Sequence, residues 1–73
     1  MKTTKYFEFI RLRPDRALIR DEWIELVIHH PVKDGRIRRW APIEEMGGRF
    51  LRVVLLVDRE TVHNAFFDRR FTL

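Results

Sequence analysis

The sequence predicts a single small α+β domain over residues 1–73, in which one or two N-terminal helical pieces pack on a three- to four-stranded, mostly antiparallel sheet. Three observations lead to this prediction. The first half of the chain repeats apolar residues at helical spacing. The second half holds alternating and continuous apolar runs separated by turn residues. With 73 residues, the chain is long enough for one hydrophobic core and too short for two.

The segment over residues 5–12 fits two structures. Its side chains alternate as in a short strand, with Tyr6 and Ile10 on one side and Phe7 on the other. A helix is the alternative, because Thr4 is a favourable N-cap and because Phe7 and Ile10 also fall at helical spacing. The sequence leaves this choice open.

The clearest helical pattern covers residues 15–29. Its apolar residues recur at three- and four-residue steps: Leu18, Ile19, Trp23, Ile24, Val27 and Ile28. Acidic residues in the middle of this segment favour a second helix start, since carboxylates stabilise a helix N-terminus. We therefore expect a break near Arg20, with residues 21–29 as the firmer helix, and Pro31 ends it.

The second half of the chain predicts a three-stranded antiparallel meander. Asp34-Gly35 is a hairpin-type turn, and residues 36–43 after it alternate between the two faces of a strand. Residues 50–57 are almost wholly apolar and predict a central strand that is covered on both sides. A tight reversal at residues 58–60 leads to a last strand over residues 61–67.

Arginine dominates the charge of this protein. The chain has 15 cationic and 11 acidic residues, a formal net charge of +4, and twelve of the cations are arginine. Because a guanidinium meets phosphate with two parallel hydrogen bonds, this bias favours a phosphate-bearing partner, with RNA or DNA first. The alternative is a GC-rich genome, with acidic neighbours that pair many arginines on the surface. The basic end over residues 68–71 is expected to fray or to assist phosphate binding.

The absence of cysteine excludes disulfides and thiolate metal sites, and it fits a reducing compartment. No apolar run has the length of a signal peptide core or of the ~20 residues that span a bilayer. We therefore expect a cytoplasmic protein. His29 and His30 precede Pro31 at a helix end, where they suit a C-terminal cap better than a chelate, so we predict no metal and no cofactor.

Four residues are the candidates for RNA or phosphate binding. Arg36, Arg38 and Arg52 lie on neighbouring predicted strands. A hairpin that is symmetric about Gly47-Gly48 would bring these arginines close together. Trp40 shares the face of Arg36 and Arg38, and an aromatic ring beside arginines suits the stacking of a single-stranded base. The alternative is that Trp40 is ordinary core and that acidic residues pair the arginines.

His63 is the candidate catalytic residue, because it is a conspicuous polar residue in an apolar strand. Histidine accepts and donates a proton near neutral pH, as cleavage of a phosphodiester by the 2′-hydroxyl of RNA requires. Neighbouring arginines would stabilise the charge that develops on the phosphate. The alternative is a structural histidine that hydrogen-bonds a backbone carbonyl and packs against Phe67.

The predicted order of elements resembles short bacterial proteins, many of them uncharacterised, that look like minimal members of the RelE/ParE/BrnT-like toxin superfamily. The resemblance lies in Ile-x-x-Glu-Trp-Ile-x-x-Val-Ile-x-x-Pro over residues 19–31, Asp-Gly-Arg within residues 34–40, and Arg-Val-Val within residues 49–68. It implies a RelE-like fold and the activities of that superfamily, which includes ribonucleases and gyrase poisons. The positions that match the residues of its ribonucleases are Arg36, Arg38, Arg52 and His63.

Residues and resemblance together predict a toxin-like RNA-binding protein or endoribonuclease of a toxin–antitoxin type, which a separately encoded antitoxin protein would neutralise. The alternative is a non-catalytic module that forms a homodimer or binds another partner, with its arginines solvated or paired. The sequence does not decide whether the protein is an enzyme.

Overall fold

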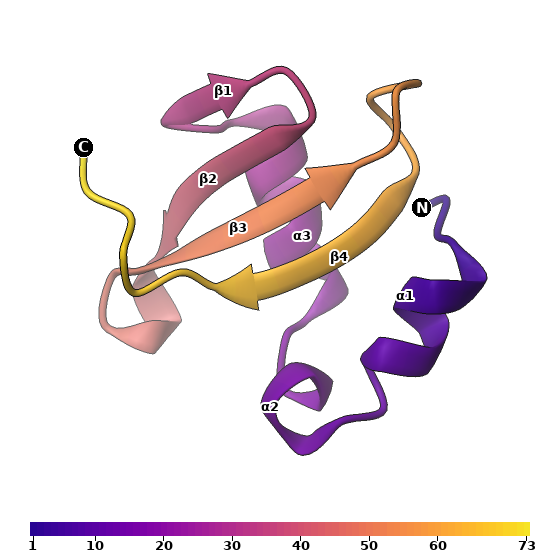
Figure 1. The fold of residues 1–73 in the computed structure, drawn as a ribbon. Coiled ribbons are helices and arrows are strands. Elements are labelled where there is room, and N and C mark those ends of the chain that lie inside the picture. The colour runs from indigo at the N-terminus through magenta and orange to yellow at the C-terminus, as the bar shows by residue number, and fades with distance from the viewer.

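The computed structural model describes residues 1–73 and shows short helices followed by a four-stranded antiparallel sheet (Figure 1). The helices are α1 (Lys5–Ile10), α2 (Pro14–Ala17) and α3 (Asp21–His29). The strands are β1 (Lys33–Gly35), β2 (Arg38–Ile43), β3 (Arg49–Leu55) and β4 (Val62–Phe67), with a 3-10 helix over Glu44–Met46 between β2 and β3. Each strand pairs with the next one in the chain. The predicted α+β class is confirmed.

The first segment is a helix because Thr4 caps it. The Oγ1 of Thr4 accepts a hydrogen bond of 3.1 Å from the backbone N–H of Phe7, which satisfies one of the free donors at a helix start. The predicted break in the second helical segment is also present, since α2 ends at Ala17 and α3 begins at Asp21. Arg20 between them is extended, with φ −82° and ψ 147°.

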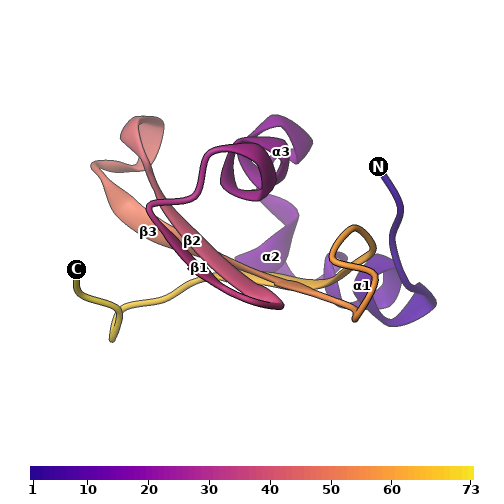
Figure 2. The ribbon, with the colours of Figure 1, turned by 90° about the horizontal axis from the view of Figure 1, so that it is seen from above.

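Helix α3 lies across one face of the sheet, as the edge-on view in Figure 2 shows. It buries Trp23, Ile24 and Val27 against β2 and β3. The hydrophobic core comprises Phe7, Ile10, Ile19, Trp23, Ile24, Val27, Ala41, Ile43, Leu51, Val53, Leu55, Val62 and Ala65. No helix lies across the opposite surface of the sheet, which we call the open face.

Strand β3 is central in the sheet, as the sequence predicts, but a helix covers only one of its faces. Its residues from Phe50 to Leu55 alternate between half-buried and buried. The prediction of a strand covered on both sides is therefore wrong. Half-buried Phe50 and Val54 are apolar for a different reason, because they belong to a layer of side chains on the open face.

The first hairpin turns two residues later than the sequence predicts. Gly35 pairs with Arg38, so Arg36 and Ile37 form the turn, and Arg36 has φ +72°. Arg36 is therefore a turn residue and not a strand residue. Gly35 remains in β1, where a Cβ would lie 3.4 Å from the indole of Trp40 and 3.3 Å from the carbonyl oxygen of Arg38. The missing side chain thus makes room for the indole.

The predicted reversal at residues 58–60 is confirmed. The carboxylate of Asp58 accepts hydrogen bonds from the backbone N–H groups of Glu60 and Thr61 and from the hydroxyl of Thr61, and Arg59 has φ +60°. Beyond this turn, Val62 opens β4 and pairs in parallel with Thr3, so that the N-terminal segment borders the start of β4. None of the helices has both the length and the apolar character needed to cross a membrane.

Candidate nucleic-acid interface

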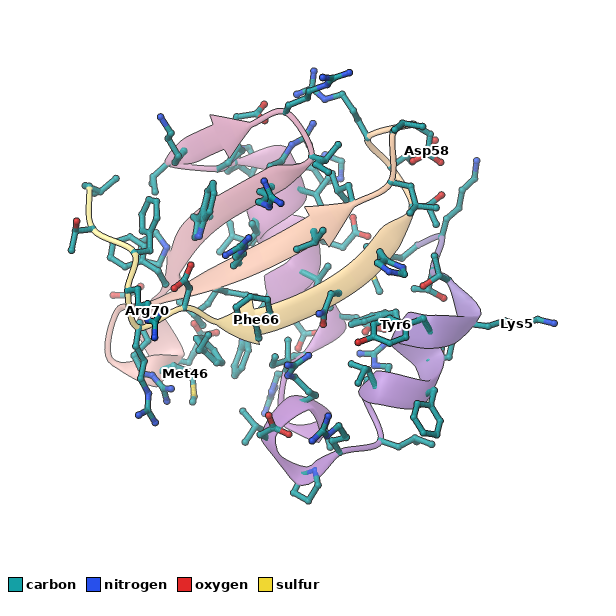
Figure 3. All side chains as sticks on the ribbon, in the orientation of Figure 1. Lys5, Tyr6, Met46, Asp58, Phe66 and Arg70 are labelled. Carbon is teal, nitrogen blue, oxygen red and sulfur yellow. The ribbon has the colours of Figure 1, made fainter.

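The open face has three rows of side chains, each of which crosses β2, β3 and the strand or segment beside them. Their members follow from the strand register, in which Trp40 lies opposite Arg52, and Arg52 lies opposite Phe66. The residues after β4, 68–73, form the C-terminal tail. From the β1–β2 turn towards this tail, the rows are Arg38–Val54–Asn64, Trp40–Arg52–Phe66 and Pro42–Phe50–Asp68. The middle row therefore places an arginine between two aromatic residues. Figure 3 shows Phe66 on the side of β4 that faces the viewer.

The guanidinium of Arg52 lies between two rings. Its Cζ is 5.4 Å from the ring centroid of Trp40 and 5.3 Å from that of Phe66. Both distances suit cation–π attraction. The Nη1 of Arg52 is 3.5 Å from the carboxylate of Asp68, while its buried Nε has no hydrogen-bond partner. Arg52 is thus held largely by aromatic contacts, with one donor unused.

Asp68 connects the open face to the tail. Its Oδ2 accepts a 3.0 Å hydrogen bond from the indole Nε1 of Trp40, and its Oδ1 accepts one of 3.1 Å from the backbone N–H of Arg70. The indole hydrogen bond is the main cause that lowers the pKa of Asp68 below its usual value. Burial acts in the opposite direction, and the contacts with Arg70 and Arg52 lower the pKa further. Asp68 is therefore an anion at neutral pH.

The tail folds back over the third row. The ring of Phe71 stacks on Trp40, with centroids 4.8 Å apart and planes 13° apart, and its edge meets Phe50 at 5.0 Å and 63°. The expectation that residues 68–71 fray is therefore wrong. Aromatic stacking and the indole hydrogen bond to Asp68 hold this segment in place. Phe71 contacts Trp40 and leaves the ring of Phe66 half-exposed at the other end of the row.

The structure brings three of the predicted binding residues onto one face and separates a fourth from them. Arg38, Trp40 and Arg52 share the open face, with Arg38 one row away from the other two. Arg36 lies in the β1–β2 turn, beyond the end of the strand. Sequence reasoning missed Phe50, Phe66, Asp68 and Phe71. The spacing of Phe50 two residues before Arg52 was the one local signal for this layer. Phe66, Asp68 and Phe71 reach the layer only because β4 and the tail pack beside β3.

His63 contacts the N-terminal helix and not the arginines of the middle row. Its Nδ1 is 3.1 Å from the Oγ1 of Thr4, and its ring stacks on Tyr6 with centroids 4.8 Å apart and planes 28° apart. Figure 3 shows Tyr6 on α1 beside β4. The imidazole therefore has a hydroxyl group and a phenol ring as its polar and aromatic neighbours, a setting that differs from both interpretations of the sequence.

Acidic residues pair only part of the positive charge. Arg39 and Arg59 both contact Asp34, and Arg11 contacts Asp21. The cations that have no carboxylate within 4.0 Å are Lys5, Arg13, Lys33, Arg36, Arg38, Arg49, Arg69 and Arg70. Several of these lie at the rim of the open face: Lys33 and Arg38 on β1 and β2, and Arg69 and Arg70 in the tail. The rim is therefore cationic, while the centre is aromatic.

Comparisons with protein-family models, with curated proteins and with solved structures found no match to this chain. The resemblance of the sequence to the toxin superfamily therefore stays a prediction.

Proposed function

We propose that this protein binds single-stranded RNA on the open face of its sheet. The observation that supports the proposal is the middle row, in which Arg52 lies between Trp40 and Phe66 on a surface that no helix covers. Phe71 covers the indole of Trp40, so the half-exposed ring of Phe66 is the surface on which an unpaired base stacks, and arginines contact the phosphates beside it. Such a surface binds single strands, because the bases of a duplex are already stacked on one another.

The rim cations supply the phosphate contacts. Lys33 lies directly opposite Trp40, and Arg38 lies opposite Val54 in the neighbouring row. Both side chains are exposed and have no carboxylate partner, so a phosphate does not have to compete with an internal anion for them. Guanidinium groups in particular bind phosphate oxygens with two hydrogen bonds. The resemblance of the sequence to toxin relatives favours RNA over DNA as the partner.

The proposal is for binding without cleavage. A histidine acts as a general acid or base only when it comes within hydrogen-bond reach of the reacting groups. His63 instead directs its Nδ1 at Thr4 and stacks on Tyr6, whereas the aromatic row that would hold the bases is centred on Arg52. Expression in a heterologous bacterium tests the toxin-like part of this proposal. We expect Arg38→Ala to relieve any growth defect and His63→Ala to keep it.

A binding titration tests the central proposal. We expect a fluorescently labelled single-stranded RNA to bind about tenfold or more weakly when salt rises from about 50 to about 200 mM, because each phosphate contact releases a counterion. Arg38→Gln should weaken binding and flatten the salt dependence. Arg13→Gln is the matched control, since Arg13 is also exposed and unpaired but lies at the start of α2.

Stacking is tested separately from charge. Phe66→Leu keeps an apolar side chain but removes the ring, and we expect it to weaken RNA binding without changing the salt slope. Circular dichroism confirms that each variant is folded. Binding that is insensitive to salt, or that Arg38→Gln and Arg13→Gln weaken equally, would overturn the proposal.

A second candidate function, self-association, is favoured by a different surface. Phe9 in α1 and Leu12, two residues beyond its end, are 70% and 77% exposed, and exposed apolar side chains that form a patch mark interaction sites. Small domains often gain stability by forming a symmetric dimer. Light scattering over a range of concentrations tests for a homodimer. We expect Phe9→Ser to shift a dimer towards the monomer, and a monomeric wild type at all concentrations would contradict this function.

A further inference from the structure

We propose that the protein also recognises the terminal phosphate monoester of its RNA at the tail end of the sheet. This inference rests on the proposed RNA binding. Two hollows, of about 270 and about 320 Å³, adjoin each other there and share Arg49, Phe67 and Arg69 as lining residues. The larger hollow by itself reaches the size of small-molecule sites, which begins at about 300 Å³.

The two shared arginines have charge that no acidic residue neutralises. Arg49 holds its guanidinium 4.7 Å from the ring centroid of Phe67, and neither Arg49 nor Arg69 has a carboxylate within 4.0 Å. The acidic residues in the hollows are already bound, Asp68 to Trp40 and Arg52, and Asp15 to Arg16 at 3.4 Å. An anion that enters between the two free arginines therefore meets uncompensated positive charge in a partly enclosed space.

One wall of the hollows continues the open face. Phe50 and Phe71 line the smaller hollow, and Phe66 lines the larger one. These rings belong to the same layer that contacts Arg52 and Trp40. Arg49 and Phe67 alternate with Phe50 and Phe66 along their strands and lie on the helix side of the sheet, so an RNA strand on the open face reaches the hollows by passing the end of the sheet. A terminal nucleotide fits this arrangement, with its base against a phenylalanine ring and its phosphate between Arg49 and Arg69.

A phosphate monoester matches this site better than an internal phosphodiester does. A monoester loses its second proton with a pKa of about 6, so it is mostly a dianion at neutral pH, and it offers three terminal oxygens to two guanidinium groups. A phosphodiester keeps a single charge at all physiological pH values. The preference for a terminal phosphate should therefore fall when the pH is lowered below about 6, because the dianion is then protonated.

Three RNAs of one sequence test the inference: one with a 5′-phosphate, one with a 3′-phosphate and one with hydroxyl groups at both ends. Fluorescence anisotropy with an internal label compares their affinities at pH values of about 7.5 and about 5.5, on either side of the monoester pKa. We expect one phosphorylated RNA to bind about tenfold tighter than the hydroxyl form at the higher pH, as about 1.4 kcal/mol of added contact implies. The end that shows this advantage identifies the source of the phosphate.

Adjacent arginines provide a matched pair of variants. Arg69→Gln removes a lining residue of both hollows, whereas Arg70→Gln removes the same charge from the next residue, which lines neither. We expect Arg69→Gln to abolish the advantage of the phosphorylated RNA and Arg70→Gln to keep it. Thermal unfolding of both variants checks that the tail remains folded.

The outcomes separate this inference from the proposed function. Equal affinity for all three RNAs overturns the terminal-phosphate site and leaves RNA binding intact. An advantage that both variants reduce equally overturns it too, because the effect would then be general charge. If no RNA binds, the proposed function and the inference both fail.

Discussion

The indole Nε1 of Trp40 donates a 3.0 Å hydrogen bond to the carboxylate of Asp68, although these residues are 28 positions apart in the chain. Trp40 belongs to β2, and Asp68 follows β4, so the bond spans the open face across β3. It brings the tail back over the sheet, where Phe71 stacks on the same indole. One aromatic side chain thus joins the sheet, the tail and the candidate RNA-binding surface.

The stability of the protein should depend on the ionisation of Asp68. Its pKa is lower in the folded chain than the value of about 3.9 that an unfolded aspartate has, mainly because of the hydrogen bond from Trp40. Ionised Asp68 therefore stabilises the fold above the unfolded pKa, and this contribution is lost as the pH falls through the folded pKa. We therefore expect the free energy of unfolding to fall less steeply below about pH 5 in Asp68→Asn than in the wild type.

Urea unfolding at a series of pH values measures this effect. Glu44→Gln is the control, because Glu44 is an exposed carboxylate without an indole or cationic partner. The wild type and the control should lose stability with similar steepness in acid, and Asp68→Asn should lose it less steeply. An identical pH dependence for Asp68→Asn and the wild type would contradict the prediction.

Asp58 should titrate well below an ordinary aspartate. Hydrogen bonds from the Thr61 hydroxyl, then from the backbone N–H groups of Thr61 and Glu60, lower the pKa of Asp58 from 3.8 to about 2. NMR of the side-chain carboxyl carbon reports its midpoint directly. We expect Thr61→Val to move the midpoint upward and Thr61→Ser to keep it low, since only serine retains the hydroxyl. Equal midpoints in the two variants would disprove the role of the hydroxyl.

Removal of the Thr4 hydroxyl should destabilise the N-terminal helix. This oxygen accepts the N-cap hydrogen bond from Phe7 and is also the partner of the His63 imidazole. We expect Thr4→Ala to lower the free energy of unfolding by about 1 kcal/mol or somewhat more, as the loss of an N-cap usually does. Thr4→Ser should retain most of the stability. Urea unfolding of the three proteins compares them, and equal losses in both variants would contradict the hydrogen-bond explanation.

Two neighbouring residues of α3 should respond very differently to truncation. Ile24 is fully buried, whereas Leu26 is 41% exposed. We expect Ile24→Ala to lower the free energy of unfolding by about 2–5 kcal/mol, because it leaves a cavity in the core. Leu26→Ala should cost clearly less. Thermal unfolding followed by circular dichroism tests this ordering, and similar losses in both variants would mean that α3 presents a different face to the sheet.

Local patterns in the sequence predicted the elements that local forces stabilise. The helical repeat of residues 21–29 and the break near Arg20 both follow from side-chain spacing and from the acidic residues at the start of α3. The alternation of Arg38 and Trp40 correctly placed them on one face, since strand side chains have a period of two. The turn signal of Asp34-Gly35 was wrong, because Gly35 pairs with Arg38 in the sheet and serves to leave room for the Trp40 indole.

The sequence by itself determined the α+β class, the excess of arginine and the shared face of Arg38 and Trp40. Only the tertiary structure decided that Arg52 lies between Trp40 and Phe66, that Phe71 covers the indole, and that His63 turns to Thr4 and Tyr6. These contacts could not be predicted because the residues that make them lie far apart in the chain. Strand register and the path of the tail depend on packing between residues that are far apart in sequence, and no local pattern specifies which of them meet.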